Sequence, residues 1–314
     1  MPSFNNGSIR LGRIAGVDLF LHWSWFLVAL YEIESHNGRY SSVGWSIAEY
    51  LALFLIVLTH EFGHAFACRQ VGGTANRIML WPLGGMAYVD PPQRPGAMLW
   101  SIAAGPLVNV ALFPLFFGAL LMVRGMGWRA SNPDAYMLIR MVLFIDVGLL
   151  IFNMLPVYPL DGGKILRSLL WFGLGRAKSL LVSVIVGIVG LVALFALAVV
   201  SMDRWLMLVA VYLLFSCWGG LQQARVLLKR EKMPRRAGFA CPSCKTPPPL
   251  GPLWKCSQCT SPFDTFQTRG VCPNCSAQYP VTMCGDCRRQ YPIKEWEVPA
   301  TANFGVVNGG IPVR

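Results

Sequence analysis

The sequence predicts an all-α membrane protein with about six transmembrane helices and a small membrane-associated β-hairpin, followed by a small β-rich domain. Three observations lead to this fold class. The chain of 314 residues is 54% hydrophobic and only 13% charged, whereas soluble domains carry roughly a quarter charged residues. About six apolar stretches approach the roughly 20 residues that cross a bilayer. Most of the 10 cysteines lie in the last quarter of the chain, in Cys-x-x-Cys pairs.

The predicted spans all lie within residues 1–220, which we expect to form one membrane domain. They are residues 19–33, 47–68, 98–123, 137–155, 179–200 and 205–218. The first and the last are short or interrupted. Residues 1–18 hold no apolar core long enough for a cleavable signal peptide, so the first span is expected to be an uncleaved anchor.

The net charge of +12 is distributed unevenly between the predicted loops. If the N-terminus is cytoplasmic, the inner loops and the segment after the last span hold 15 lysines and arginines, and the outer loops hold five. Cytoplasmic loops of membrane proteins carry such an excess. The sequence therefore predicts an integral protein of the cell (inner) membrane with both termini in the cytoplasm.

The second predicted span contains the sequence His60-Glu61-Phe62-Gly63-His64. A helix places residues i and i+4 on one face, so the two imidazoles can bind one zinc ion, with Glu61 beside it as a general base. Ionisable side chains are costly in a membrane helix, so three of them within five residues require a functional explanation. This pattern indicates a metalloprotease site within a membrane.

A catalytic zinc normally has three protein ligands and one water. The remaining histidines are His22 and His36, and His22 lies among tryptophans, which favours an interfacial anchor. Asp161 is the better candidate, because it follows two prolines that end the fourth span and precedes two glycines. Irregular backbone at membrane depth is tolerated where it lines a protected, water-accessible cavity. We therefore expect Asp161 to be the third ligand.

The chain changes character after residue 220. Residues 221–238 are polar and basic, and we expect a juxtamembrane linker that lies on anionic lipid. Residues 239–297 contain four Cys-x-x-Cys pairs, and residues 298–314 lack periodicity and are expected to be disordered. The pairs are Cys241/Cys244, Cys256/Cys259, Cys272/Cys275 and Cys284/Cys287.

Two such pairs can complete a tetrahedral zinc site with four sulfur ligands, so eight thiolates imply two structural zinc ions. Sequential pairing is the simplest arrangement, and an interleaved pairing remains open. Disulfides are disfavoured if the segment is cytoplasmic, and no βαβ pattern suggests a redox motif. The segment resembles a double zinc ribbon, and closed sites of this kind serve binding rather than chemistry.

The membrane motifs together resemble the site-2 protease family of intramembrane zinc metalloproteases. The resemblance rests on His-Glu-Phe-Gly-His and on Asn-Met-Leu-Pro-Val-Tyr-Pro-Leu-Asp-Gly-Gly at residues 153–163, and it covers roughly residues 9–221. Residues 21–24, 82–85 and 105–109 also match. No PDZ insertion or nucleotide-sensing module is evident, so the compact six-span type fits best, here with a zinc-ribbon tail.

The resemblance implies a role for each matching residue. His60, His64 and Asp161 would bind the catalytic zinc, Glu61 would activate water, and Asn153 would stabilise the oxyanion. A hairpin over residues 78–88 could accept an unwound substrate strand at its edge.

Two further polar residues, Asn109 and Asp146, lie within predicted spans. Asp146 stands where the family more often has asparagine, and we interpret it as a packing residue rather than a proton relay. Asn109 is expected to hold neighbouring helices together, or to support a gate to the site, through a side-chain hydrogen bond.

The expected function is hydrolysis of peptide bonds within or near transmembrane segments of membrane-anchored regulators or remnant signal peptides. A catalytically silent scaffold that binds transmembrane helices is the alternative, and the intact ligand set argues against it. A transporter would show internal repeats and paired broken helices, and neither is visible. The expected partners are a membrane-spanning substrate, the lipid bilayer and a soluble partner of the ribbon domain, with no specific nucleic acid.

Overall fold

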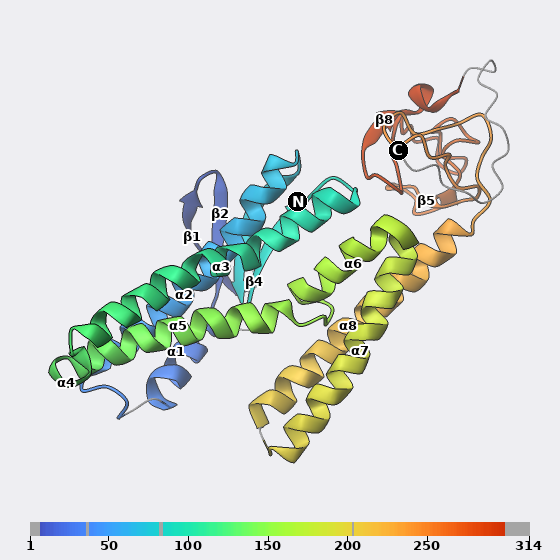
Figure 1. Cartoon of the computed structure of the whole chain (residues 1–314). Helices are drawn as coiled ribbons and strands as arrows, with labels where there is room; N and C mark the ends of the chain where they lie inside the picture. The colour runs from blue at the N-terminus through green and yellow to red at the C-terminus, as the bar shows by residue number, and fades with distance from the viewer. Residues whose placement is uncertain (1–6, 36–37, 82–83, 203, 299–314) are drawn as a thin grey trace. The chain divides into compact units, whose positions relative to one another are not determined.

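The computed structural model describes residues 7–35, 38–81, 84–202 and 204–298 (Figure 1). The chain divides into two compact units, residues 1–225 and residues 226–314. The tail predicted to be disordered therefore lies almost wholly outside the described residues, as do Pro82 and Leu83 of the predicted hairpin.

Five helices among the described residues are long and apolar enough to cross a membrane. They match five of the six predicted spans, and they are α2 (Val43–Gln70), α3 (Pro95–Gly125), α5 (Pro133–Met154), α7 (Arg176–Val200) and α8 (Arg204–Glu231). The shorter helices are α1 (Ser24–Ser35), α4 (Trp128–Ser131) and α6 (Asp161–Leu174). Helices α2, α3 and α5 pack against one another, and α6 packs against α3 and α7 (Figure 1).

The first predicted span is not a helix along its whole length, so the expected count of six spanning helices is not confirmed. Its first part forms the strand β2 (Val17–His22), which continues into the short helix α1. The side chains of Val17 and Leu19 alternate into the core and are 0% and 3% exposed, which is the two-residue period of a strand. A short apolar stretch can form either a strand or a helix. The apolar composition alone therefore led to the wrong prediction of a single helix here.

This extended segment runs along α2 in the opposite direction. The Arg69 guanidinium donates to the carbonyls of Ala15 (2.6 Å) and Gly16 (3.0 Å), and the Tyr50 hydroxyl donates to the carbonyl of Trp25 (2.9 Å). Residues 50 and 69 of a helix are about 29 Å apart. Residues 15–25 therefore cover most of the length of α2 without forming a transmembrane helix.

The strands of the first unit form one four-stranded sheet in the order β1-β2-β3-β4. Strand β1 (Ser8–Ile14) is antiparallel to β2, β2 is parallel to β3 (Thr74–Trp81), and β3 is antiparallel to β4 (Gly84–Asp90). The predicted hairpin over residues 78–88 is thus confirmed as β3–β4, and the sheet is larger than the sequence analysis predicted. The inner strands pack on the second half of α2 through Val57, Ala65 and Cys68.

The second unit is built from short paired segments around the cysteine pairs. Strands β5 (Trp254–Lys255) and β6 (Pro262–Phe263) form one hairpin, and β7 (Val281–Met283) and β8 (Gln290–Pro292) form another. Isolated bridges join residues 235 and 249, and residues 271 and 278. The core contains Phe266 and Trp296, whose rings meet edge to face at 4.9 Å. The basic segment predicted as a linker begins inside α8, which continues to Glu231.

Candidate metal centres

The two histidines of α2 and the aspartate of α6 come together in the first unit. The Nε2 atoms of His60 and His64 are 3.1 Å apart, and Asp161 Oδ2 lies 3.1 Å from each of them. All three side chains are buried, with exposed fractions of 3%, 8% and 6%. The structure therefore brings together the three ligands that the sequence analysis proposed, although Asp161 lies 101 positions after His60.

Helix α6 can place Asp161 here because the two residues after it are glycines. A Cβ atom on Gly162 would lie 2.4 Å from the carbonyl oxygens of Met154 and Leu155, and a Cβ on Gly163 would lie 2.6 Å from the backbone nitrogen of Tyr158. Any side chain at either position would push the start of α6 away from the end of α5. The close approach therefore requires glycine at both positions after Asp161.

Both imidazoles are oriented through their other ring nitrogen. His64 Nδ1 lies 2.9 Å from the backbone oxygen of Ser101, and His60 Nδ1 lies 2.6 Å from Oδ1 of Asn109. A ring that donates from Nδ1 carries a bare lone pair on Nε2. The Nε2 atoms of His60 and His64 then point lone pairs at one another, with Asp161 Oδ2 as a third donor atom.

This donor set fits a zinc ion. Zn–N bonds of about 2.0–2.1 Å place two ligand atoms of a tetrahedral site roughly 3.3 Å apart, close to the 3.1 Å observed here. Gly105 of α3 packs directly against the ligands, since a Cβ atom there would lie 2.3 Å from His64 Nε2 and 2.7 Å from His60 Nε2. Helix α3 thus closes one side of the site with backbone alone.

The sequence analysis missed how α3 supports the site. Ser101, Gly105 and Asn109 recur every four residues and therefore share one helix face, and each contacts or closely approaches a candidate ligand. Small and polar residues at that spacing in an otherwise apolar span were the signal that could have revealed this face.

The other predicted site residues are placed as follows. Glu61 is 5% exposed, and one carboxylate oxygen of Glu61 and one nitrogen from each of His60 and His64 all lie within 4.8 Å of one another. Asn153 is half-buried in the last turn of α5, ahead of the loop that leads to Asp161. His22 stacks on Trp81 with 4.2 Å between ring centroids, which agrees with a packing role. His36 lies outside the described residues.

Comparison with known proteins shows a similar family for the first unit. The model of peptidase family M50 matches residues 48–132 and 128–197. The zinc metalloprotease MJ0392 of Methanocaldococcus jannaschii is 30% identical over 224 residues, which make up 71% of this chain and 62% of that protein. Stage IV sporulation protein FB of Bacillus subtilis is 33% identical over 118 residues, or 37% of this chain and 38% of that protein.

A solved structure is also similar. The site-2 protease from Methanocaldococcus jannaschii matches with a TM-score of 0.50 and 28% identity, over 68% of this chain and 95% of that one. The first unit is therefore similar to proteins of peptidase family M50. The M50 match covers the helices that carry His60, His64 and Asp161 and ends before the cysteine-rich unit. The chain spans 62% and 38% of the lengths of the two curated relatives.

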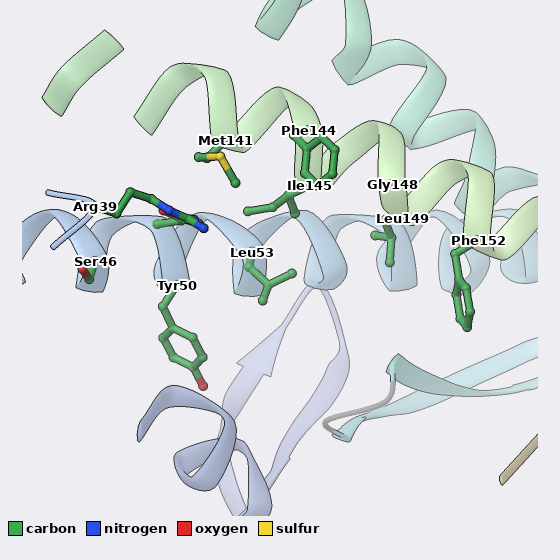
Figure 2. Close-up of a pocket in the computed structure, with 11 residues that line it drawn as sticks. Arg39, Ser46, Tyr50, Leu53, Met141, Phe144, Ile145, Gly148, Leu149 and Phe152 are labelled. Atoms are coloured by element: carbon green, nitrogen blue, oxygen red, sulfur yellow. The ribbon is translucent and has the colours of Figure 1, made fainter. Parts of the chain in front are cut away.

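The first unit also contains a cavity of about 430 Å³ between α2 and α5 (Figure 2). None of the candidate ligands lines it. Its lining is mostly apolar and includes Leu53, Phe144 and Phe152. At one end Arg39 donates to Glu49 Oε1 at 3.0 Å.

The eight cysteines of the second unit form two groups of four. Cys241, Cys244, Cys284 and Cys287 form one, and Cys256, Cys259, Cys272 and Cys275 form the other. The sequential pairing that we took as the simplest is therefore wrong, because the first pair meets the fourth and the second meets the third. The second and fourth pairs each lie in the loop of a hairpin, β5–β6 and β7–β8. The isolated bridge between Phe239 and Glu297 holds the segment before the first pair against the segment after the fourth, which agrees with this nesting.

The distances between the sulfur atoms fit zinc rather than disulfides. Sγ atoms of opposing pairs lie 3.4–3.7 Å apart, whereas a disulfide bond is about 2.05 Å long. Zn–S bonds of about 2.3 Å place the sulfurs of a tetrahedral site about 3.8 Å apart. In the group of Cys256, Cys259, Cys272 and Cys275, the Tyr279 hydroxyl lies 3.1 Å from Cys256 Sγ. This contact lowers the pKa of the Cys256 thiol to about 6, which favours the thiolate that a metal requires.

All four pairs are built by the same turn. In each pair, the residue after the second cysteine donates its backbone N–H to the carbonyl of the first cysteine at 2.9 or 3.0 Å. That residue has a positive φ angle of 58–61° in every case, and the four are Lys245, Thr260, Ser276 and Arg288. This left-handed conformation costs non-glycine residues roughly 1–2 kcal/mol. The four turns direct the eight sulfur atoms toward two points. Metal binding at those points would offset the strain of the turns.

Proposed function

We propose that this chain is an intramembrane zinc endopeptidase. The observation that carries the proposal is the convergence of His60 Nε2, His64 Nε2 and Asp161 Oδ2 at 3.1 Å, with Glu61 beside them. The two histidines and Glu61 lie in α2, which is apolar enough to cross a membrane, and Asp161 begins α6. A relative is named a zinc metalloprotease and a similar structure is that of a site-2 protease, which supports the same activity for this chain.

Each residue of the site would have a separate role in peptide hydrolysis. A zinc ion bound by His60, His64 and Asp161 would supply a Lewis acid that polarises the scissile carbonyl and acidifies a water molecule. Glu61 would accept the proton of the attacking water and pass it to the leaving amine. Asn153 would donate its amide to the carbonyl oxygen of the scissile bond, where negative charge develops.

We infer that the substrate is a membrane-spanning protein, either a membrane-anchored regulator or a remnant signal peptide. A helix protects its own peptide bonds by hydrogen bonding, so the substrate must unwind locally before cleavage. Strand β4 lies at an edge of the sheet, and an unwound segment could pair with that edge. The helices around the site are apolar enough to cross a membrane, which supports a location of the site within the bilayer.

We also propose that both termini are cytoplasmic. Five helices alone would make an odd number of crossings. Residues 15–25 run along α2 from Arg69 to Tyr50 and would supply a sixth crossing, mostly as strand β2. The backbone of β2 pairs with β1 and β3, which satisfies its hydrogen bonds as non-helical backbone at membrane depth requires. An even number of crossings agrees with the distribution of lysine and arginine.

The cysteine-rich unit would hold two structural zinc ions and bind a soluble partner. Its two groups of four sulfurs leave no open coordination position, so we assign it no catalytic role. A cavity of about 480 Å³ in this unit, lined by Trp254, Val281 and Met283 among others, offers a surface for such a partner.

The proposed activity can be tested with Glu61→Gln in the full-length protein reconstituted in proteoliposomes. Newly formed peptide ends from co-reconstituted membrane-anchored substrates are identified by mass spectrometry. We expect the wild-type protein to cleave and Glu61→Gln to bind the same amount of zinc without cleaving. Glu49→Gln is the matched control, because it makes the same change in α2 outside the site and should leave cleavage intact. Equal cleavage by the wild-type protein and Glu61→Gln would refute the mechanism, and zinc binding without any cleavage would favour the scaffold.

A further inference from the structure

We propose that Asp146 is a positioning residue that acts through Asn109 to fix the tautomer of the zinc ligand His60. The inference rests on the proposed function, because it assigns His60 Nε2 to a metal. The sequence analysis interpreted Asp146 as a packing residue, but its contacts connect it to the candidate metal centre.

The connection consists of two short hydrogen bonds between buried groups on three helices. Asn109 Nδ2 of α3 donates to Asp146 Oδ1 of α5 at 2.7 Å, and Asn109 Oδ1 lies 2.6 Å from His60 Nδ1 of α2. The side chains of Asn109 and Asp146 are 0% exposed, and His60 is 3% exposed. The three residues therefore form a chain of contacts that ends at the metal-facing imidazole.

Asp146 decides which way the Asn109 amide faces. A carboxylate accepts hydrogen bonds, so it pairs with the amide nitrogen and leaves the amide oxygen for His60. That oxygen can only accept, so His60 must carry its proton on Nδ1 and keep the lone pair of Nε2 for the metal. If Asn109 were reversed, its amide nitrogen would face Nδ1 and would favour the opposite tautomer, which cannot bind zinc through Nε2.

His64 needs no residue that corresponds to Asp146. His64 Nδ1 lies against the backbone oxygen of Ser101, and a carbonyl is always an acceptor. His60 instead faces a side-chain amide that can present either an acceptor or a donor. The residue behind that amide therefore has to remove the ambiguity.

Packing alone does not explain an aspartate at this position. Asp146 Oδ2 is buried and has no hydrogen-bond partner among the described residues, and a buried polar atom without a partner costs stability. An apolar residue at this position would avoid that cost. Asparagine could offer Asn109 either its oxygen or its amide nitrogen, so it should preserve the function of the contact only in part.

The test measures zinc affinity in the full-length protein in detergent by competition with a chelator, following the ion that is not held by the cysteine groups. We expect Asp146→Leu to weaken this site by about 10- to 100-fold, as loss of a group that orients a ligand typically does. Asp146→Asn, whose amide can face Asn109 with either its oxygen or its nitrogen, should weaken the site less than Asp146→Leu. Asp134→Leu and Asp134→Asn make the same changes in the first turn of α5 and serve as matched controls.

A double variant keeps the test decisive if Asp146→Leu fails to fold. Asn109→Asp removes the donor to Asp146 and places two carboxylates against each other, so its zinc affinity should fall. The double variant Asn109→Asp/Asp146→Asn restores both contacts with donor and acceptor exchanged, and it should recover most of the lost affinity. A merely structural role gives no reason for this rescue.

The outcomes separate the inference from the proposed function. If the wild-type protein holds no zinc beyond that of the cysteine groups, the proposed function fails and the inference falls with it. If it holds that zinc, but Asp146→Leu binds as tightly as the wild type, or the double variant is no better than Asn109→Asp, only the inference is overturned.

Discussion

A methyl group placed on Gly105 should abolish the catalytic zinc site while leaving the rest of the protein folded. Gly105 lies in α3, where its Cα faces the two imidazoles of α2. The Cβ atom of Gly105→Ala would lie 2.3 Å from His64 Nε2, 2.4 Å from His64 Cε1 and 2.7 Å from His60 Nε2.

These distances set the size of the effect. Non-bonded atoms of this kind prefer separations of about 3.5–4.0 Å, so the imidazoles would have to move by roughly 1 Å. Metal–ligand distances tolerate deviations of only about 0.2 Å. The required displacement is about five times that tolerance, and two of the three ligands would be displaced together.

Zinc content of the purified full-length protein measures the outcome. We expect about three zinc ions per wild-type chain, one for each candidate group, and about two in Gly105→Ala. Gly118→Ala is the matched control, because it makes the same substitution in α3 with open space around the new atom. That control should keep all of its zinc and gain up to about 1 kcal/mol of stability from the better helix former. Unchanged zinc content in Gly105→Ala would refute the placement of α3 against the metal ligands.

The remaining predictions concern the cysteine-rich unit of the zinc-loaded protein, measured by denaturant unfolding followed through tryptophan fluorescence. Asp264 accepts hydrogen bonds from Arg236 and from three backbone N–H groups and is 6% exposed, so Asp264→Ala should lower the free energy of unfolding by about 3 kcal/mol. Asp286→Ala breaks a more exposed ion pair and should cost less than about 1 kcal/mol; equal losses would contradict the burial argument. Thr260 has a φ angle of 59°, so Thr260→Gly should stabilise the unit by about 1 kcal/mol. A loss of stability in Thr260→Gly would mean that the threonine side chain contributes more than its backbone strain costs.

Local patterns in the sequence were sufficient to predict the candidate catalytic ligands. The i, i+4 spacing fixes how His60 and His64 share a helix face, whatever the tertiary fold. Asp161 was found because a carboxylate between prolines and glycines at the end of an apolar span is unusual in a membrane. The hairpin of β3 and β4 was also predicted, because its two strands lie close together in the sequence.

The contacts that depend on distant segments could not be predicted in the same way. Strand β2 was placed in a span because its apolar residues satisfy a helix or a strand equally, and only its pairing with β1 and β3 decides between them. The nested pairing of the cysteine groups depends on how hairpins fold back on one another. The contact between Asn109 and Asp146 joins two helices whose relative rotation no local pattern reveals.

The central claim is most directly tested by counting zinc in a truncated protein. A chain that ends at Arg236 lacks all eight paired cysteines and retains His60, His64 and Asp161. In detergent, it should bind about one zinc ion per chain through the candidate group of α2, and Asp161→Ala should lose or weaken that ion while remaining folded. A folded truncation that binds no zinc would contradict the account, since the only metals of the protein would then belong to the cysteine groups.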